Sequence, residues 1–211
     1  ILLYNRNVKE LMRMKRILFL CTGNTCRSPM AEAFLKGLAH EKGLILAVRS
    51  AGISTIDGLP VSVNSQHALS RRGIQHQGSS VSMNEEALQW ADIILTMTTS
   101  HKREVMRRYP EVIDKLYTLK EFAYMDGNLQ AQFNELETLY SELQMQQALG
   151  KSINDGMLKR ARQLEMSLPS FDIADPFGGS QSVYDACADE LEDAIFKLVD
   201  KLIEQRNRER K

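Results

Sequence analysis

The chain has 211 residues, 43% hydrophobic and 26% charged, which suits one globular domain with a substantial core. Lys and Arg number 27 and Asp and Glu also number 27, so the formal net charge is zero, which argues against broad electrostatic binding to nucleic acid or an anionic membrane. No stretch approaches the roughly 18 apolar residues that span a bilayer, so we expect no membrane partner and a cytoplasmic location.

The cysteines and the start of the chain set the expected domain organisation. Three cysteines, Cys21, Cys26 and Cys187, are too few for a disulfide framework and indicate a reducing compartment. Cys187 falls at an apolar position of the last predicted helix and is expected in the core. We expect residues 1–14 to form a mobile or loosely helical N-terminal tail, followed by a single domain over residues 15–211.

Segments typical of strands and helices alternate along the chain. Strands are predicted at 17–20, 44–50, 91–97 and 115–119, and helices at 28–43, 63–72, from a cap at Ser82 or Asn84 through Trp90, at 100–109, and at 182–206. Strands that alternate with helices over short connections favour a parallel sheet. We therefore predict an α/β fold, a four-stranded parallel sheet with helices on both faces, and a ligand outside the carboxyl end of a strand.

The loop between the first strand and the first helix is the most informative stretch. It comprises Cys21, Thr22, Gly23, Asn24, Thr25, Cys26, Arg27 and Ser28. Ser28 is the predicted N-cap, and Pro29 suits the first helical turn, where its missing amide has no intrahelical partner. Loop amides and a helix N-terminus form a nest for a phosphate-like oxyanion.

Side chains of this loop turn an anion site into a reactive one. The amides and the helix dipole stabilise the Cys21 thiolate, which makes it a nucleophile. Arg27 offers a planar fork of donors that grips two oxygens of a phosphoryl group. Gly23 is expected to take unusual backbone dihedrals, Asn24 to brace the loop, and the Ser28 hydroxyl to point at the sulfur.

A second motif, Asp175-Pro-Phe-Gly-Gly, precedes the last predicted helix. By itself it predicts only a turn. An acid held on such a stiff turn can nevertheless be positioned over a ligand that is far away in sequence. Asp175 is therefore the candidate partner of the first loop.

The segment Cys-Thr-Gly-Asn-Thr-Cys-Arg-Ser-Pro-Met-Ala-Glu resembles the low-molecular-weight protein phosphatase family, and looks like its bacterial arginine-phosphatase branch. The resemblance implies the Rossmann-like fold of phosphotyrosine protein phosphatase I and hydrolysis of phosphorylated proteins, without cofactor or metal. It also implies that Cys21 forms a phosphocysteine, that Arg27 binds phosphate, and that Asp175 is general acid and then base.

The resemblance extends to further residues. The residues expected to contact the substrate are Thr22, Gly23, Asn24, Thr25, Cys26, Ser28 and Phe177. Phe177 is expected either to form a wall of the substrate cleft or to anchor its own loop. The family's Ser-Ala-Gly turn corresponds to residues 50–52, where Ser50 would support Asn24. Cys26 either packs in the loop or forms a reversible disulfide with Cys21.

The chain departs from the family between Phe122 and Asp175, where about fifty residues replace a short connection. Apolar residues at helical spacing, interrupted by Gly150 and with Asn154 or Asp155 as a second cap, predict an inserted helical hairpin over about 126–170. We hypothesise that the hairpin modulates access to the active site or docks a partner. The alternative is a passive surface elaboration.

Thr25 is the residue that bears on specificity, and several functions remain open. Tyrosine-specific members carry a larger aliphatic residue at this position, so the polar Thr25 favours phosphoarginine over phosphotyrosine. A thiol-dependent arsenate reductase is disfavoured because residues 79–98 contain no Cys and Cys187 lacks a partner. A phospho-residue binding module would not require both Cys21 and Asp175. A zinc site is disfavoured because Cys21 and Cys26 have no nearby Cys or His pair at the spacing of zinc ligands. His67 is interpreted as structural.

Overall fold

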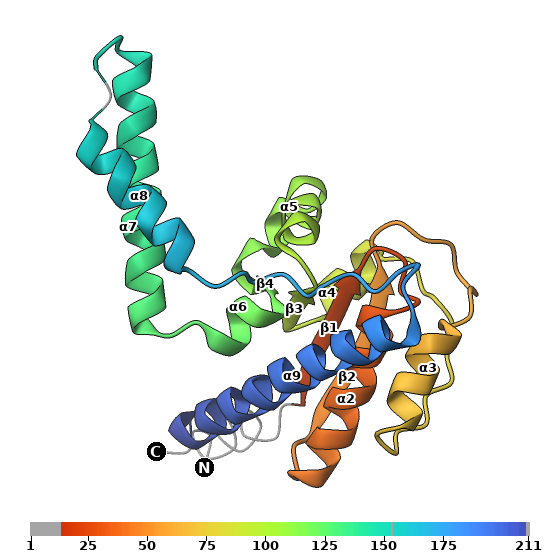
Figure 1. Ribbon diagram of the computed structural model, residues 1–211. Coiled ribbons are helices and arrows are strands. Elements are labelled where there is room, and N and C mark those ends of the chain that lie inside the picture. Colours follow the sequence, from red (N-terminus) through yellow and green to blue (C-terminus); the bar gives the residue numbers. More distant parts are fainter. Residues whose placement is uncertain (1–13, 153, 210–211) are drawn as a thin grey trace. The chain divides into compact units, whose positions relative to one another are not determined.

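The computed structural model describes residues 14–152 and 154–209 (Figure 1). The predicted N-terminal tail lies, except for Met14, outside these residues. The chain divides into two compact units: one comprises the chain up to Tyr124 and again from Phe171, and the other is Met125–Ser170. Within the described ranges, no helix is both long and apolar enough to cross a membrane.

The first unit is an α/β fold, as predicted. Its parallel sheet has the strand order β2-β1-β3-β4, formed by β1 (Lys15–Cys21), β2 (Leu46–Gly52), β3 (Ile93–Thr96) and β4 (Leu116–Thr118). Its helices are α2 (Arg27–Glu41), α3 (Val63–Ser70), α4 (Glu85–Trp90), α5 (Thr99–Arg108), the 3-10 helix η1 (Pro110–Lys115), α6 (Leu119–Tyr124) and α9 (Gln181–Glu209). The predicted four strands and the helices between them are thereby confirmed, whereas η1 and α6 were not predicted.

Strand β1 shows why helices cover both faces of the sheet. Successive side chains of a strand point to opposite faces. Ile17, Phe19 and Cys21 belong to the core cluster shared with α2 and α9, whereas Leu18 and Leu20 belong to the cluster shared with α4 and α5. All five are at most 3% exposed. A strand with a continuous apolar run, here Ile17–Cys21, is the expected signature of a parallel sheet buried on both faces.

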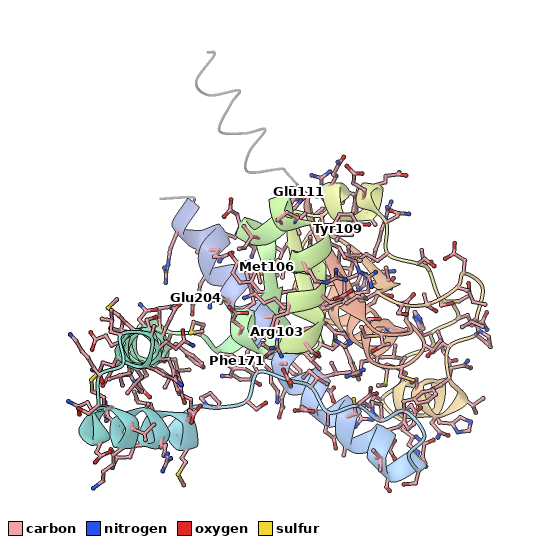
Figure 2. The ribbon with its side chains drawn as sticks, turned by 90° about the horizontal axis from the view of Figure 1, so that it is seen from above. Arg103, Met106, Tyr109, Glu111, Phe171 and Glu204 are labelled. Atoms are coloured by element: carbon pink, nitrogen blue, oxygen red, sulfur yellow. The ribbon has the colours of Figure 1, made fainter. Side chains whose placement is uncertain are left out.

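The core cluster that contains Leu18 and Leu20 covers the face of the sheet on which α5 packs. Met106 of α5 and Tyr109, the C-cap of that helix, are both labelled in Figure 2 and pack at the margin of this cluster. The fully buried Leu88 and Val105 lie inside it. Helix α5 starts directly after β3 and packs on this face of the sheet. The first turn of α5 therefore lies at the edge where the carboxyl ends of the strands meet.

The second strand lies two residues later than predicted. Leu44 extends the apolar run in the sequence, but its amide donates to Ala39 O (2.8 Å), and Gly43 with φ 60° ends α2 in the left-handed conformation. Strand β2 therefore continues to Gly52. Ser50, the last residue of the predicted strand, pairs with Phe19 of β1, and residues 51–52, which the resemblance placed in a turn, lie within the strand as well.

The unit Met125–Ser170 contains the predicted pair of helices, α7 (Gly127–Ala148) and α8 (Asp155–Ser167). Gly150 follows α7 with φ 64°, and Asn154 caps α8 by accepting from Met157 N (3.0 Å). An ion pair between Arg160 and Glu135, at 2.7 Å, joins the two helices. The inserted helical hairpin predicted from the sequence is confirmed.

Candidate active site

The candidate site lies at the carboxyl ends of β1 and β3, which are neighbours in the middle of the sheet. The connection after β1 leads to β2 on one side, and the connection after β3 leads to β4 on the other. In open α/β sheets the crevice between such diverging connections is where ligands bind. We call Thr22–Cys26, which follows β1, the phosphate loop.

Cys21 lies at the base of the phosphate loop. It is 3% exposed, and its Sγ accepts from Asn24 N at 3.2 Å and lies 3.0 Å from Ser28 Oγ. Helix α2 begins at Arg27, and its N-cap, Cys26, makes no side-chain cap hydrogen bond. The prediction of Ser28 as N-cap is therefore wrong, because its hydroxyl is directed to the Cys21 sulfur. The first amides of α2 and its positive end face the phosphate loop.

Asn24, rather than Gly23, takes the unusual backbone conformation. Its φ is +52°, and Gly23 is not among the glycines with positive φ. Asparagine tolerates this region because its short polar side chain bonds locally. The side chain is 1% exposed: Nδ2 donates to Ser28 Oγ (2.9 Å) and Ser50 Oγ (2.8 Å), and Oδ1 accepts from Val81 N (2.8 Å). The expected contact of Asn24 with Ser50 is thus present.

Glu32, which the sequence analysis did not assign a role, fixes the direction of these hydrogen bonds. Its Oε2 accepts from Ser50 Oγ at 2.6 Å. Since Ser50 donates to a carboxylate, it accepts from Asn24 Nδ2, whose other hydrogen goes to Ser28 Oγ. The Ser28 hydrogen is then left for the Cys21 sulfur. The chain of bonds from Glu32 therefore supplies a donor that stabilises a thiolate.

Arg27 connects the phosphate loop to the second motif. Its side chain is 5% exposed, and Nη2 pairs with Asp175 Oδ2 at 2.7 Å across 148 residues of sequence. Its Nη1 donates to Ile173 O at 3.4 Å. Its Nε is buried, and no acceptor for it is found among the described residues. A buried guanidinium with an unused donor beside a nest of amides suits a phosphoryl oxygen.

Asp175 lies on a tight turn beside the phosphate loop. Its Oδ1 accepts from Phe177 N (3.2 Å), Gly179 N donates to Pro176 O (2.9 Å), and Gly178 has φ 77°. The Asp175 side chain is 53% exposed, so its carboxylate reaches solvent. Phe177 is 80% exposed, so it does not anchor the loop by packing. Its place at a substrate cleft stays a prediction.

His101 is a neighbour of the site that the sequence analysis missed. It lies in the first turn of α5, with Nε2 2.8 Å from Thr22 Oγ1 and Nδ1 2.9 Å from Thr98 Oγ1. Burial, with a further contribution from the Arg27 charge, lowers the pKa of His101 to about 4. It is therefore a neutral hydrogen-bonding group beside the phosphate loop at neutral pH. The signal available in the sequence was its position just after a buried strand.

The remaining candidate residues are divided between the site and the core. Thr25 is partly exposed, with Oγ1 3.6 Å from Cys26 Sγ, and Cys26 Sγ lies 3.4 Å from Tyr184 Oη. Cys187 is 2% exposed, and burial raises its pKa to about 12. Its predicted place in the core is confirmed, and such a thiol is unsuited to relay electrons. His67 is exposed on α3. Among residues 14–152 and 154–209, no three His, Cys, Asp or Glu are grouped to hold a metal ion.

Comparisons with known proteins agree with this geometry. The sequence model of the family described as low molecular weight phosphotyrosine protein phosphatase matches residues 16–140. A protein-arginine-phosphatase of Geobacillus stearothermophilus is 36% identical over 187 residues, 89% of this chain and 95% of the relative. The solved structure of YwlE arginine phosphatase from that organism has a TM-score of 0.66 at 35% identity, covering 92% of this chain and 96% of that one. A cysteine-to-serine YwlE variant with a phosphorylated active-site serine has a TM-score of 0.68 at 30% identity, covering 91% and 98%.

Proposed function

The chain belongs to the low molecular weight phosphotyrosine protein phosphatase family, and we propose that it hydrolyses phosphoarginine residues of proteins through a phosphocysteine on Cys21. The observation that carries the proposal is the pairing of Arg27 with Asp175 at 2.7 Å. It brings a phosphate-binding guanidinium, a thiol held by hydrogen-bond donors and a solvent-reaching acid into one site.

In the first step, the Cys21 sulfur attacks phosphorus as the bond from phosphorus to the arginine nitrogen breaks. Arg27, through its unused Nε and its Nη groups, and the loop amides hold the equatorial oxygens. Phosphoryl oxygens compete with the Asp175 carboxylate for Nη2, so substrate binding separates the ion pair. Asp175 in its acid form then protonates the departing nitrogen, which leaves arginine and a phosphocysteine.

In the second step, the Asp175 carboxylate takes a proton from water as that water attacks phosphorus. The bond from phosphorus to sulfur breaks, and inorganic phosphate leaves. Ser28 Oγ and Asn24 N, at 3.0 and 3.2 Å from Sγ, donate to the thiolate that reforms. The phosphorylated serine in the YwlE variant supports a covalent route in the family.

Thr25 supports the choice of phosphoarginine. A guanidinium carries donors up to its tip, and an apolar wall would leave them without partners. The partly exposed Thr25 supplies a hydroxyl at the rim of the phosphate loop. The Asp175 carboxyl can receive the same guanidinium as it protonates the leaving nitrogen.

Phosphotyrosine is the second candidate substrate, and Phe177 is the observation that favours it. Its ring is 80% exposed next to Asp175, where it can pack on a tyrosine ring. An exposed aromatic face also stacks on a guanidinium, so Phe177 accommodates either side chain. Thr25 therefore decides between the two substrates.

The test is hydrolysis of a phosphoarginine peptide and a phosphotyrosine peptide of otherwise identical sequence, under reducing conditions. We expect the wild-type protein to prefer phosphoarginine in kcat/KM. Thr25→Ile should shift the ratio of the two kcat/KM values toward phosphotyrosine by roughly tenfold or more. Thr25→Ser, which keeps the hydroxyl, is the matched control and should retain the preference.

The outcomes separate the alternatives. Wild-type preference for phosphotyrosine would overturn the use of Thr25 and keep the mechanism. An unchanged ratio in Thr25→Ile would remove Thr25 as the cause of the preference. Turnover of neither peptide would favour a non-catalytic module that binds phosphorylated residues.

A further inference from the structure

The segment that carries Asp175 is irregular in conformation but fixed at successive backbone groups. Ile173 N donates to Met97 O at the end of β3 (2.8 Å), and Ile173 itself is 1% exposed in the core. The Cys187 thiol of α9 donates to Ala174 O at 3.5 Å. Because burial raises the Cys187 pKa to about 12, this thiol stays protonated and keeps its donor. We call Asp172–Ala174 the anchor segment; Phe171, labelled in Figure 2, precedes it.

The ion pair between Lys120 and Glu190 forms hydrogen bonds with both ends of the anchor segment. Lys120 of α6 donates to Asp172 O at 3.0 Å and pairs with the carboxylate of Glu190 on α9. The other Glu190 oxygen accepts from Ala174 N at 3.0 Å. Both side chains are partly buried, with exposed fractions of 18% for Lys120 and 28% for Glu190. Because the pair binds backbone groups at two points of the segment, it favours one arrangement of the backbone there.

We propose that Glu190, together with Lys120, is a positioning residue for catalysis: the pair sets the place of Asp175 as the proton donor to the leaving group. The proposal rests on the proposed function of Asp175. Glu190 acts through the backbone amide of Ala174, the residue directly before the acid. Its hydrogen bonds with Lys120 and Ala174 join it to residues outside the phosphate loop.

The contacts of Asp175 itself explain why such an anchor matters. Its carboxylate is half-exposed and is held by Arg27 and by Phe177 N. Once phosphoryl oxygens take the Arg27 donors, the backbone before Asp175 is what keeps the acid near the leaving atom. A misplacement of about 1 Å can cost on the order of a hundredfold in rate.

The test uses leaving groups of different basicity. A departing phenolate, with a pKa of about 10 as in tyrosine, needs the acid, whereas the more acidic p-nitrophenolate depends on it less. In Glu190→Ala, kcat/KM for phenyl phosphate should therefore fall about tenfold more than kcat/KM for p-nitrophenyl phosphate. Alkylation of Cys21 by iodoacetamide should proceed at the wild-type rate. Asp200→Ala, which removes an exposed acid of the same helix, is the control and should leave both rates unchanged.

A double-mutant cycle distinguishes positioning from general loosening of the fold. In an Asp175→Asn background, Glu190→Ala should no longer change the ratio of the two rates, because the group that it positions is gone. Lys120→Met removes the other half of the pair. In the protein that keeps Asp175, it should change the ratio of the two rates as Glu190→Ala does, even if Glu190→Ala also lowers the unfolding temperature. Equal losses on both aryl phosphates, or an effect that persists without Asp175, would overturn the proposal. Failure of the wild type to hydrolyse a phosphoarginine peptide, as well as both aryl phosphates, would overturn the proposed function itself.

Discussion

The phosphate loop and the anchor segment of Asp175 both serve the site, but different parts of the chain hold them. The phosphate loop is braced partly by a local bond, from Asn24 to Ser28, and partly by Ser50, Val81 and His101 from other parts of the chain. The anchor segment is held at its backbone by residues from β3, α2, α6 and α9. The phosphate loop therefore has internal bracing by its own side chains, whereas each of these contacts of the anchor segment comes from another element.

This difference has a functional meaning. A loop that must stabilise charge gains from rigid, short-range hydrogen bonds that need no rearrangement. An acid that is released from Arg27 when phosphate binds needs a fixed attachment and a free side chain. Changes in the phosphate loop should therefore affect every substrate, whereas changes around Asp175 should affect substrates according to their leaving groups.

The largest expected effect is that of Cys21→Ala. Removal of the nucleophile should lower turnover of a phosphoarginine peptide and of p-nitrophenyl phosphate alike, by about 10⁴-fold or more. Circular dichroism and thermal unfolding establish that the variant folds. Residual activity within about tenfold of the wild type, under the same conditions, would contradict the assignment.

Asp175→Asn should have a smaller and substrate-dependent effect. We expect kcat for a phosphoarginine peptide to fall by about 10²- to 10³-fold, because the departing nitrogen loses its proton donor. The loss with p-nitrophenyl phosphate should be clearly smaller. Asp200→Asn serves as the control. Equal losses on the two substrates would assign Asp175 to the structure rather than to proton transfer.

Asn24→Ala tests the local bracing. It leaves the Val81 amide and the Ser28 and Ser50 hydroxyls without their Asn24 partners and places alanine at φ +52°. The free energy of unfolding should decrease by about 1–3 kcal/mol, and kcat/KM should fall by roughly tenfold on acidic and basic leaving groups alike. Asn134→Ala, on α7 of the other unit, should change neither quantity. A loss confined to basic leaving groups would break the contrast between the two segments.

The smallest expected effect is on the pH dependence of stability through His101. Its pKa is about 4 in the folded protein and near 6.5 in the unfolded chain. Between these values the unfolded chain binds more protons, so the free energy of unfolding falls as pH is lowered. His101→Asn should flatten this fall in denaturant titrations, whereas His67→Asn, at an exposed position of α3, should not. An identical decline in His101→Asn and wild type would show that His101 does not titrate in this way.

The sequence could reveal the parts of the site that are contiguous or lie on a turn. Cys21 and Arg27 belong to one short segment between a strand and a helix, and Asp175 lies in a turn with Pro176 and two glycines. Apolar runs and caps likewise predicted the four strands and most helices. These features depend on neighbours in the chain, which propensity and spacing can report.

The contacts that depend on strand neighbours could not be predicted in the same way. His101 reaches Thr22 because β3 lies next to β1, and the order of the strands has no local signal. Glu190 reaches Ala174 because α9 folds back beside the segment that precedes it, which local spacing does not report either. The error at Ser28 has a similar cause: its hydroxyl binds the Cys21 sulfur in preference to capping α2, a choice that tertiary contacts make.

The most direct test of the account is to locate the phosphoryl group during turnover. The protein is mixed with a phosphoarginine peptide, quenched with denaturant at mildly alkaline pH within the first turnover, digested and analysed by mass spectrometry. Cleavage after Arg16 and Arg27 releases one peptide, in which fragmentation separates Cys21 from Cys26. We predict phosphate on Cys21 that appears together with the released arginine peptide, before inorganic phosphate accumulates, and that disappears as inorganic phosphate is released. Turnover without phosphate on Cys21, or with phosphate on another residue, would contradict the account.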